Sequence, residues 1–174
     1  MTFSGGEPMM QHKALLELLS LSRRHGLHTT IDTSGFAKQE LFRQILPLTD
    51  LFLYDLKHMD SDLHRTHTAV DNKLILANAD YLLSEGAQLT FRIPVIPGIN
   101  TTPGELDAFR TYIEERKEKL TELHLLPYHR IAENKYFRLK MKEKLQDVKE
   151  PDDTMLQDIK TYFETTGLQV VIGG

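Results

Sequence analysis

The strongest constraint on the fold is a regular alternation of extended and helical segments along the whole chain. The extended segments predicted from β-rich composition are residues 1–4, 28–32, 50–57, 88–95, 123–126 and 168–172. Helical segments separate them, with Pro8 and Pro103 at expected helix starts and Gly26 at an expected helix end. The run 50–57 is almost continuously apolar, which is typical of a parallel sheet covered on both faces. The pattern therefore predicts an α/β fold, a partial (β/α) TIM-like barrel of parallel strands with outer helices.

The chain reads as one domain, residues 1–174, because no repeat, low-complexity tract or linker interrupts this alternation. Acidic and basic residues are interleaved and the net charge is −4, so nothing indicates a nucleic-acid partner. No apolar run approaches the roughly 18 residues that a membrane span needs, and we expect a cytoplasmic protein. The sequence contains no cysteine, which excludes disulfides and an iron–sulfur cluster held by the chain's own thiolates.

Polar residues gather at one kind of place, the carboxyl ends of the predicted strands. They are Ser4, Gly5, Gly6 and Glu7, then Asp32 to Gly35, Asp55 to Lys57, Arg92, and Pro127 to His129. In parallel α/β sheets and barrels, this edge carries the active site. The sequence therefore predicts that side chains from five strands meet on one rim.

Each of these segments also has an ordinary structural interpretation. Gly5 and Gly6 could simply form a turn, and Asp32 or Ser34 could cap a following helix. Asp55 and the lysine two residues later could form an exposed ion pair of little energetic value.

The other histidines and charged residues are better explained by structural roles than by a functional site. His58, His64 and His67 invite comparison with a zinc site, but no carboxylate pattern accompanies them, so we expect a solvated surface. The charge run 114–119 is explained by a solvated helix face. His129 alone would usually be a loop histidine.

Five strings of residues carry a resemblance that covers essentially the whole chain. In order, they are TFSGGEP at 2–8, DTSGF at 32–36, DLKHM at 55–59, FRIPVIPGIN at 91–100 and LLPYH at 125–129. The first resembles the radical S-adenosylmethionine enzymes in general. The third and fifth narrow the resemblance to activating enzymes of glycyl radical enzymes, such as the pyruvate formate-lyase type.

The resemblance implies that one set of residues binds S-adenosylmethionine and that a second set binds a monovalent cation. The residues implied for S-adenosylmethionine are Ser4, Gly5, Gly6, Glu7, Asp32, Thr33, Lys57, Arg92 and His129. Within this set, the segment 4–7 would hold the methionyl amino group, Lys57 and Arg92 would face its carboxylate, and His129 would lie near the ribose. The residues implied for the cation are Asp32, Thr33, Asp55 and the carbonyl of Leu53. Hard oxygen ligands suit such an ion.

The resemblance also implies groups that these 174 residues do not supply. Members of this family bind a 4Fe–4S cluster through Cys-x-x-x-Cys-x-x-Cys, which is absent here. We therefore expect a C-terminal portion that lacks the first strand and is inactive alone. Its parent would use a flavodoxin or ferredoxin-type reductant to cleave S-adenosylmethionine and place a radical on a glycine of a partner enzyme. An unpaired sheet edge also predicts self-association.

Two departures and two alternatives accompany this interpretation. Thr68-Ala69-Val70 stands where Thr-Gly-Val is usual, and Lys140 to Lys144 is more basic than the resemblance predicts. One alternative is a non-catalytic module that binds S-adenosylmethionine or a nucleoside and docks a partner. The other is a radical S-adenosylmethionine enzyme that acts on a small molecule.

Overall fold

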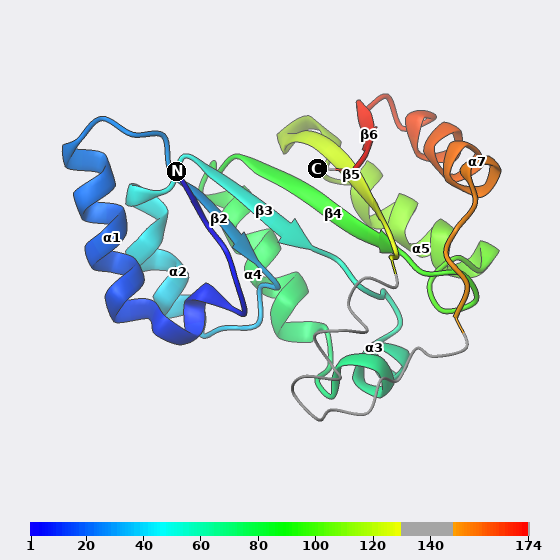
Figure 1. Cartoon of the computed structure of the whole chain (residues 1–174), viewed down its shortest axis with the longest axis horizontal. Helices are drawn as coiled ribbons and strands as arrows, with labels where there is room; N and C mark the ends of the chain where they lie inside the picture. Colours follow the sequence, from blue (N-terminus) through cyan, green and yellow to red (C-terminus); the bar gives the residue numbers. More distant parts are fainter. Residues whose placement is uncertain (130–147, 174) are drawn as a thin grey trace.

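The fold is an open parallel sheet flanked by helices (Figure 1). The computed structural model describes residues 1–129 and 148–173, and Lys140 to Lys144 lies outside them. The strands are β1 (Thr2–Phe3), β2 (Thr30–Thr33), β3 (Leu51–Asp55), β4 (Leu89–Val95), β5 (Leu120–Pro127) and β6 (Val170–Ile172). They lie side by side in chain order, and each neighbouring pair is parallel. The predicted partial barrel of parallel strands is therefore confirmed, with β1 and β6 at its separate edges.

Helices connect the strands, and several of their starts follow directly from the sequence. They are η1 (Pro8–Gln11), α1 (His12–Arg24), α2 (Gln39–Ile45), η2 (Leu46–Leu48), α3 (Ser61–Thr68), α4 (Lys73–Ser84), α5 (Pro103–Glu114), η3 (Lys117–Lys119) and α7 (Asp153–Glu164). The predicted first helix begins at Pro8 as a 3₁₀ turn. Asp60 and Asp152 cap α3 and α7 by accepting hydrogen bonds from backbone N–H groups. Both of these helices therefore begin where a capping side chain satisfies their free donors.

The two faces of the sheet differ in chemistry because side chains alternate along each strand. One face carries Ile31, Phe52, Tyr54 and Phe91, which are fully buried in a single core together with helix residues such as Leu82. We call the opposite one the inner face; it is defined by the residues that the register aligns there, namely Asp32, Leu53, Asp55, Thr90, Arg92, Glu122 and His124. The apolar face holds the fold together, and the inner face carries the polar groups.

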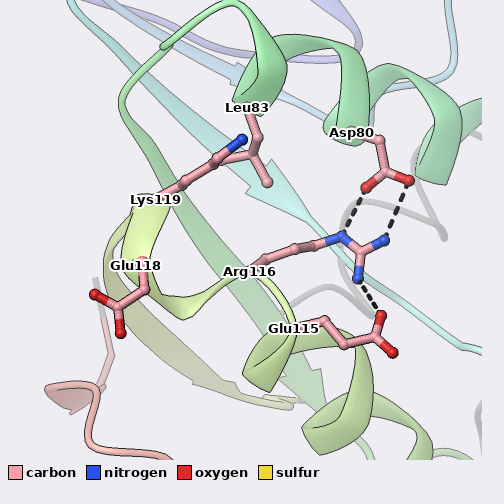
Figure 2. Close-up of a pocket in the computed structure, with 6 residues that line it drawn as sticks. All are labelled: Asp80, Leu83, Glu115, Arg116, Glu118 and Lys119. Atoms are coloured by element: carbon pink, nitrogen blue, oxygen red, sulfur yellow. Dashed lines mark hydrogen bonds and ion pairs between the residues drawn. The ribbon is translucent and has the colours of Figure 1, made fainter.

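The charge run 114–119 is mostly solvated, as the sequence predicts, but Arg116 within it is largely buried. Figure 2 shows Arg116, just beyond α5, reaching Asp80 on α4. Its Nε lies 2.6 Å from Asp80 Oδ1, and its guanidinium carbon lies 3.6 Å from the centre of the Tyr112 ring. Only 20% of the Arg116 side chain is exposed, because the run wraps the end of α5 against α4. The hollow beside it, about 280 Å³, lies near the amino ends of the strands, where active sites of this architecture are seldom found.

Ala69 ends α3 in a conformation that suits glycine. Its φ is 71°, and among the described residues it is the only non-glycine residue with a positive φ. A left-handed alanine costs roughly 1–2 kcal/mol, whereas glycine adopts this conformation without steric penalty. We therefore expect Ala69→Gly to raise the free energy of unfolding by about 0.5–1 kcal/mol, since part of the gain is lost to the flexibility of glycine in the unfolded chain. Urea denaturation checks this, and a lower midpoint than that of the wild type would contradict it.

Candidate functional site

Arg92 joins two carboxylates across three neighbouring strands of the inner face. Asp55 on β3 is its register partner, and Asp32 lies on β2. Arg92 Nε and Nη2 donate to Asp55 Oδ1 at 2.9 and 2.6 Å. Arg92 Nη1 donates to Asp32 Oδ2 at 3.2 Å, and Nη2 also donates to Asp32 Oδ1. The planar guanidinium fork thus bridges β4 to β2, two strands that are not adjacent to each other, through one side chain.

The three side chains are mostly buried, and their charges are held by mutual attraction. The exposed fractions of the side chains are 12% for Arg92, 22% for Asp32 and 20% for Asp55. Burial raises the pKa of Asp55, and the attraction of Arg92 and Lys57 only partly offsets it. Burial alone would lower the pKa of Arg92, but the carboxylates of Asp55 and Asp32 together raise it. The guanidinium therefore stays charged, and the pKa of Asp55 lies above its ordinary value.

Ser4 and Lys57 extend this network toward the carboxyl edge of the sheet. Ser4 Oγ donates to Asp32 Oδ2 at 2.8 Å. Lys57 Nζ lies 4.0 Å from Asp55 Oδ2, and 42% of the Lys57 side chain is exposed. The ion pair between Asp55 and Lys57 that the sequence allowed is therefore present but long, and Arg92 makes the closer contacts with Asp55. The ammonium of Lys57 remains accessible to a bound anion.

Glu7 ties the loop after β1 to the loop after β2. Its carboxylate accepts hydrogen bonds from Thr33 Oγ1 at 2.7 Å, Ser34 N at 2.8 Å and Ser34 Oγ at 2.5 Å. It also accepts one from the backbone N–H of Met9 at 3.2 Å. Ser34 thus anchors Glu7 and does not cap α2, whose N-cap is Lys38 with no side-chain hydrogen bond. Holding this loop is the role that the structure gives to the Glu7 carboxylate.

The loop that Glu7 anchors exposes its backbone to solvent. Gly5 and Gly6 have φ values of 93° and 61°, which glycine adopts without strain. A Cβ atom at either position would meet nothing within 4 Å. Open backbone beside Ser4 is suited to a ligand that is bound through main-chain groups.

The groups implied for a monovalent cation are only partly brought together. Asp32, Leu53 and Asp55 share the inner face through the register of β2 and β3. Thr33 lies on the opposite face, where its hydroxyl donates to Glu7 and accepts from the backbone N–H of Gly35. Only main-chain oxygen of Thr33 could join such a site, because its hydroxyl is already engaged. A cation here stays a prediction, and Arg92 would share the two carboxylates with it.

His129 lies apart from the Arg92 network. It follows the end of β5, and 59% of its side chain is exposed. Its Nδ1 lies 3.8 Å from Glu150 Oε2. The predicted contact with a ribose stays a prediction that rests on the resemblance.

His58 and His64 are buried, so the expectation of a solvated surface was wrong for both. His58 Nδ1 lies 2.9 Å from Glu105 Oε1, and its Nε2 lies 3.2 Å from the carbonyl oxygen of Ile99. His64 Nδ1 lies 2.7 Å from the carbonyl oxygen of Val70. Both rings brace loops through hydrogen bonds. Within the described residues, no group of three or more histidine or carboxylate side chains is arranged to hold a metal ion.

A hollow of about 590 Å³ opens beside this bracing, between α3 and the start of α5. Met59, Leu63 and His67 line one side, and Ile99, Gly104 and Ala108 line the other. Leu63 is 45% exposed. His58 and Met59, which follow Lys57 in the chain, belong to its lining, and the lining is partly apolar.

Sequence reasoning missed one polar pair on the inner face, Glu122 and His124. The predicted strand began at residue 123 because the residues before it are polar, whereas β5 begins at Leu120. His124 is the register partner of Arg92, and its Nε2 lies 2.7 Å from Glu122 Oε1. Alternate polar residues within β5 were the signal that could have revealed a polar-lined face.

The residues present fit S-adenosylmethionine but not an iron–sulfur cluster. A methionyl group carries a carboxylate and an ammonium. The accessible ammonium of Lys57 suits the carboxylate, and the carboxylates around Arg92 and the open glycine loop suit the ammonium. The cluster needs thiolates, and the sequence has no cysteine.

Within the described residues, no helix is long and apolar enough to cross a membrane.

Comparisons with known proteins point to one superfamily. The sequence pattern of the radical SAM superfamily matches residues 1–109. The chain is 34% identical over 174 residues to the trans-4-hydroxy-L-proline dehydratase activating enzyme of Clostridioides difficile, covering 99% of this chain and 58% of that protein. It is also 34% identical over 174 residues to a 4-hydroxyphenylacetate decarboxylase activating enzyme of C. difficile strain CD196, covering 99% of this chain and 54% of that protein. The chain thus spans a little over half the length of these curated relatives.

A solved structure matches the chain from end to end. It is a domain of pyruvate-formate lyase-activating enzyme from Bacteroides vulgatus, with a TM-score of 0.84 and 28% sequence identity. The match covers 100% of this chain and 98% of that domain. The unit that these residues form has therefore been observed as a discrete domain of a similar protein.

Proposed function

The chain belongs to the radical SAM superfamily, and from this we propose that the longer protein containing it activates a glycyl radical enzyme. The observation that carries the proposal is that curated relatives aligned over nearly the whole chain are activating enzymes of dehydratases and decarboxylases. When bound, the cluster would supply the electron that reductively cleaves S-adenosylmethionine. The residues of this chain do not hold the cluster, because the sequence has no cysteine. A reductant of the flavodoxin or ferredoxin type and a cytoplasmic location, where thiols stay reduced, complete the proposal.

The inner face would bind and orient the methionyl part of S-adenosylmethionine. Lys57 would pair with the methionyl carboxylate, because 42% of its side chain is exposed and its ion pair with Asp55, at 4.0 Å, is long. Arg92 would hold Asp32 and Asp55 in place and keep their charges compensated. The open backbone at Gly5 would approach the methionyl amino group.

Lys57→Met tests this assignment in the chain itself. We expect binding of S-adenosylmethionine to weaken about tenfold or more, since a charged hydrogen bond contributes about 1.5–3 kcal/mol. Lys13→Met, an exposed lysine on α1, is the matched control and should bind like the wild type. Isothermal titration calorimetry measures both, and equal affinities for the two variants would contradict the assignment.

The hollow beside α3 would receive the partner's glycine-bearing segment. Its lining includes His58 and Met59, which directly follow Lys57 in the chain, and it is partly apolar, as the cores of interfaces commonly are. Leu63→Asp should therefore abolish most glycyl radical formation and leave 5′-deoxyadenosine formation intact. Leu21→Asp on α1 is the matched control, because Leu21 is 44% exposed and Leu63 is 45% exposed.

The experiment uses the longer protein loaded with iron and sulfide, a chemical reductant and candidate glycyl radical enzymes. Electron paramagnetic resonance follows the glycyl radical, and chromatography follows 5′-deoxyadenosine. No 5′-deoxyadenosine from a cluster-loaded protein would refute the proposal. Formation of 5′-deoxyadenosine without a radical on any partner would favour a small-molecule substrate. Ligand binding by a protein that never takes up a cluster would favour a binding module.

A further inference from the structure

His124 is a largely buried imidazole on the inner face, and the proposed function does not use it. It is the register partner of Arg92, which in turn is the register partner of Asp55. Its side chain is 12% exposed. It therefore stands at the same level of the sheet as the charged network, one strand further along.

The hydrogen bonds of His124 are unevenly satisfied. Nε2 lies 2.7 Å from Glu122 Oε1, and Nδ1 is buried with no hydrogen-bond partner among the described residues. A carboxylate beside Nε2 keeps the proton on that nitrogen, which leaves Nδ1 of a neutral ring as an acceptor. A buried acceptor without a donor costs about 1–3 kcal/mol. A buried polar atom without a partner calls for an explanation, and of the four such side-chain atoms in the described residues only His124 Nδ1 belongs to a residue of the inner face.

The position of His124 selects the part of the ligand that it would meet. The groups suited to a methionyl moiety lie on β1 to β4 and in the segments that follow them, namely Gly5, Asp32, Lys57 and Arg92. The next strand beyond β4 is β5, so a part of the ligand that reaches past Arg92 along the sheet would meet His124. The remaining part of S-adenosylmethionine is a nucleoside, which offers ribose hydroxyl and adenine amino donors.

We infer that His124, oriented by Glu122, is a ligand-binding residue that accepts a hydrogen bond from the nucleoside part of the ligand. This inference rests on the proposed function. Because Nδ1 is covered in the structure, the groups that cover it must shift for the contact to form. Glu122 is a positioning residue, since it fixes which nitrogen of His124 carries the proton.

Two ligands and two substitutions of His124 test the inference in this 174-residue chain. 5′-Methylthioadenosine carries the nucleoside alone, and methionine carries the amino acid alone. We expect His124→Leu to weaken binding of 5′-methylthioadenosine about tenfold, as the loss of one hydrogen bond implies, and to leave methionine binding unchanged. His124→Asn keeps an acceptor near the position of Nδ1 and should recover most of the affinity. His25→Leu, an exposed histidine just beyond α1, is the matched control.

Stability and nuclear magnetic resonance separate a binding role from a structural one. His124→Leu removes an unpaired buried acceptor and leaves Glu122, whose side chain is 32% exposed, in contact with water. The variant should therefore be at least as stable as the wild type in urea while it binds the nucleoside more weakly. In ¹⁵N-histidine spectra, the His124 Nδ1 resonance should move when 5′-methylthioadenosine is added, and that of His25 should not.

The outcomes distinguish this inference from the proposed function. Unchanged nucleoside affinity in His124→Leu, equal losses for both ligands, or a wild-type chain that binds no 5′-methylthioadenosine would each overturn it. The proposed function depends separately on 5′-deoxyadenosine and radical formation by the longer, cluster-loaded protein. Normal product formation by that protein carrying His124→Leu, with unchanged affinity, would remove the role of His124 and leave the proposed function standing.

Discussion

Replacing Arg92 by leucine should lower the free energy of unfolding by about 3 kcal/mol, because it leaves two buried carboxylates without their common partner. Asp32 and Asp55 both bind the same guanidinium, and at most 22% of any of the three side chains is exposed. Removing the cation costs more than the ion pairs themselves stabilise, since the carboxylates stay buried and repel each other. Urea denaturation at neutral pH measures the loss.

The matched control is Arg23→Leu. Arg23 Nη1 lies 2.7 Å from Asp50 Oδ1, but the exposed fractions of these side chains are 46% and 29%. Exposed pairs of this kind contribute about 1 kcal/mol or less. If both substitutions cost the same, burial of the Arg92 network would not be the source of its effect.

The pH dependence of the Arg92→Leu variant provides an independent check. Burial already raises the pKa of Asp55, and Arg92 is the larger of the charges that oppose this rise. Without Arg92, the pKa of Asp55 in the folded chain moves further above its value in the unfolded chain. Folding then favours the protonated carboxyl, so the variant gains stability as pH falls from about 7 toward about 5. The gap between wild type and variant should narrow over this range, and a constant gap would argue against Asp55 as the unpaired group.

Most of the fold could be predicted from the sequence, because alternation of apolar strands and capped helices leaves few arrangements. The parallel sheet and the meeting of Asp32, Asp55 and Arg92 on one face follow from strand periodicity. The contacts of Thr33 were less accessible, because one residue of offset along β2 turns its hydroxyl away from Asp32 and toward Glu7.

Other parts of the site depended on tertiary contacts that no local pattern records. His58 and His64 are on or near a short, polar helix, yet loop carbonyls and Glu105 bury them. Glu122 was missed because a polar residue at the start of a strand resembles a loop, and His124, although inside the predicted strand, was missed because no local pattern shows that it faces Arg92. Burial of a polar residue depends on partners that are distant in the sequence, so no local pattern reveals it.

Gly35→Ala should lower the free energy of unfolding by about 4 kcal/mol, although it adds only one methyl group. A Cβ atom on Gly35 would lie 1.9 Å from Tyr54 Oη and 2.2 Å from its Cζ, and φ is already 75°. Tyr54 cannot retreat easily, because it is fully buried and its hydroxyl donates to the carbonyl oxygen of Ile75 at 2.6 Å. The backbone of Gly35 is held too, by the side-chain amide of Asn78 at 2.9 Å. Overpacking of about 1–3 kcal/mol then adds to left-handed strain of about 1–2 kcal/mol.

Gly98→Ala separates the clash from the backbone strain. Gly98 has a φ of 76°, almost the same as Gly35, but a Cβ atom there meets nothing within 4 Å. We expect Gly98→Ala to cost about 1 kcal/mol, so the excess loss in Gly35→Ala measures the collision with Tyr54. Tyr54→Phe removes the nearest colliding atom and should therefore cost less in the Gly35→Ala background than in the wild type. Equal losses for the two glycine substitutions would show that Tyr54 moves aside.

Gly35→Ala should also affect the candidate site, because Ser34 connects Gly35 to Glu7. Ser34 directly precedes Gly35, and its N–H and hydroxyl both donate to Glu7, which anchors the loop carrying Gly5 and Gly6. A displaced Gly35 therefore loosens the loop that we assign to the methionyl amino group. In Gly35→Ala molecules that remain folded at low temperature, affinity for methionine should fall at least several-fold, whereas Gly98→Ala should bind it normally. Wild-type affinity in folded Gly35→Ala would show that the Glu7 anchor does not depend on this turn.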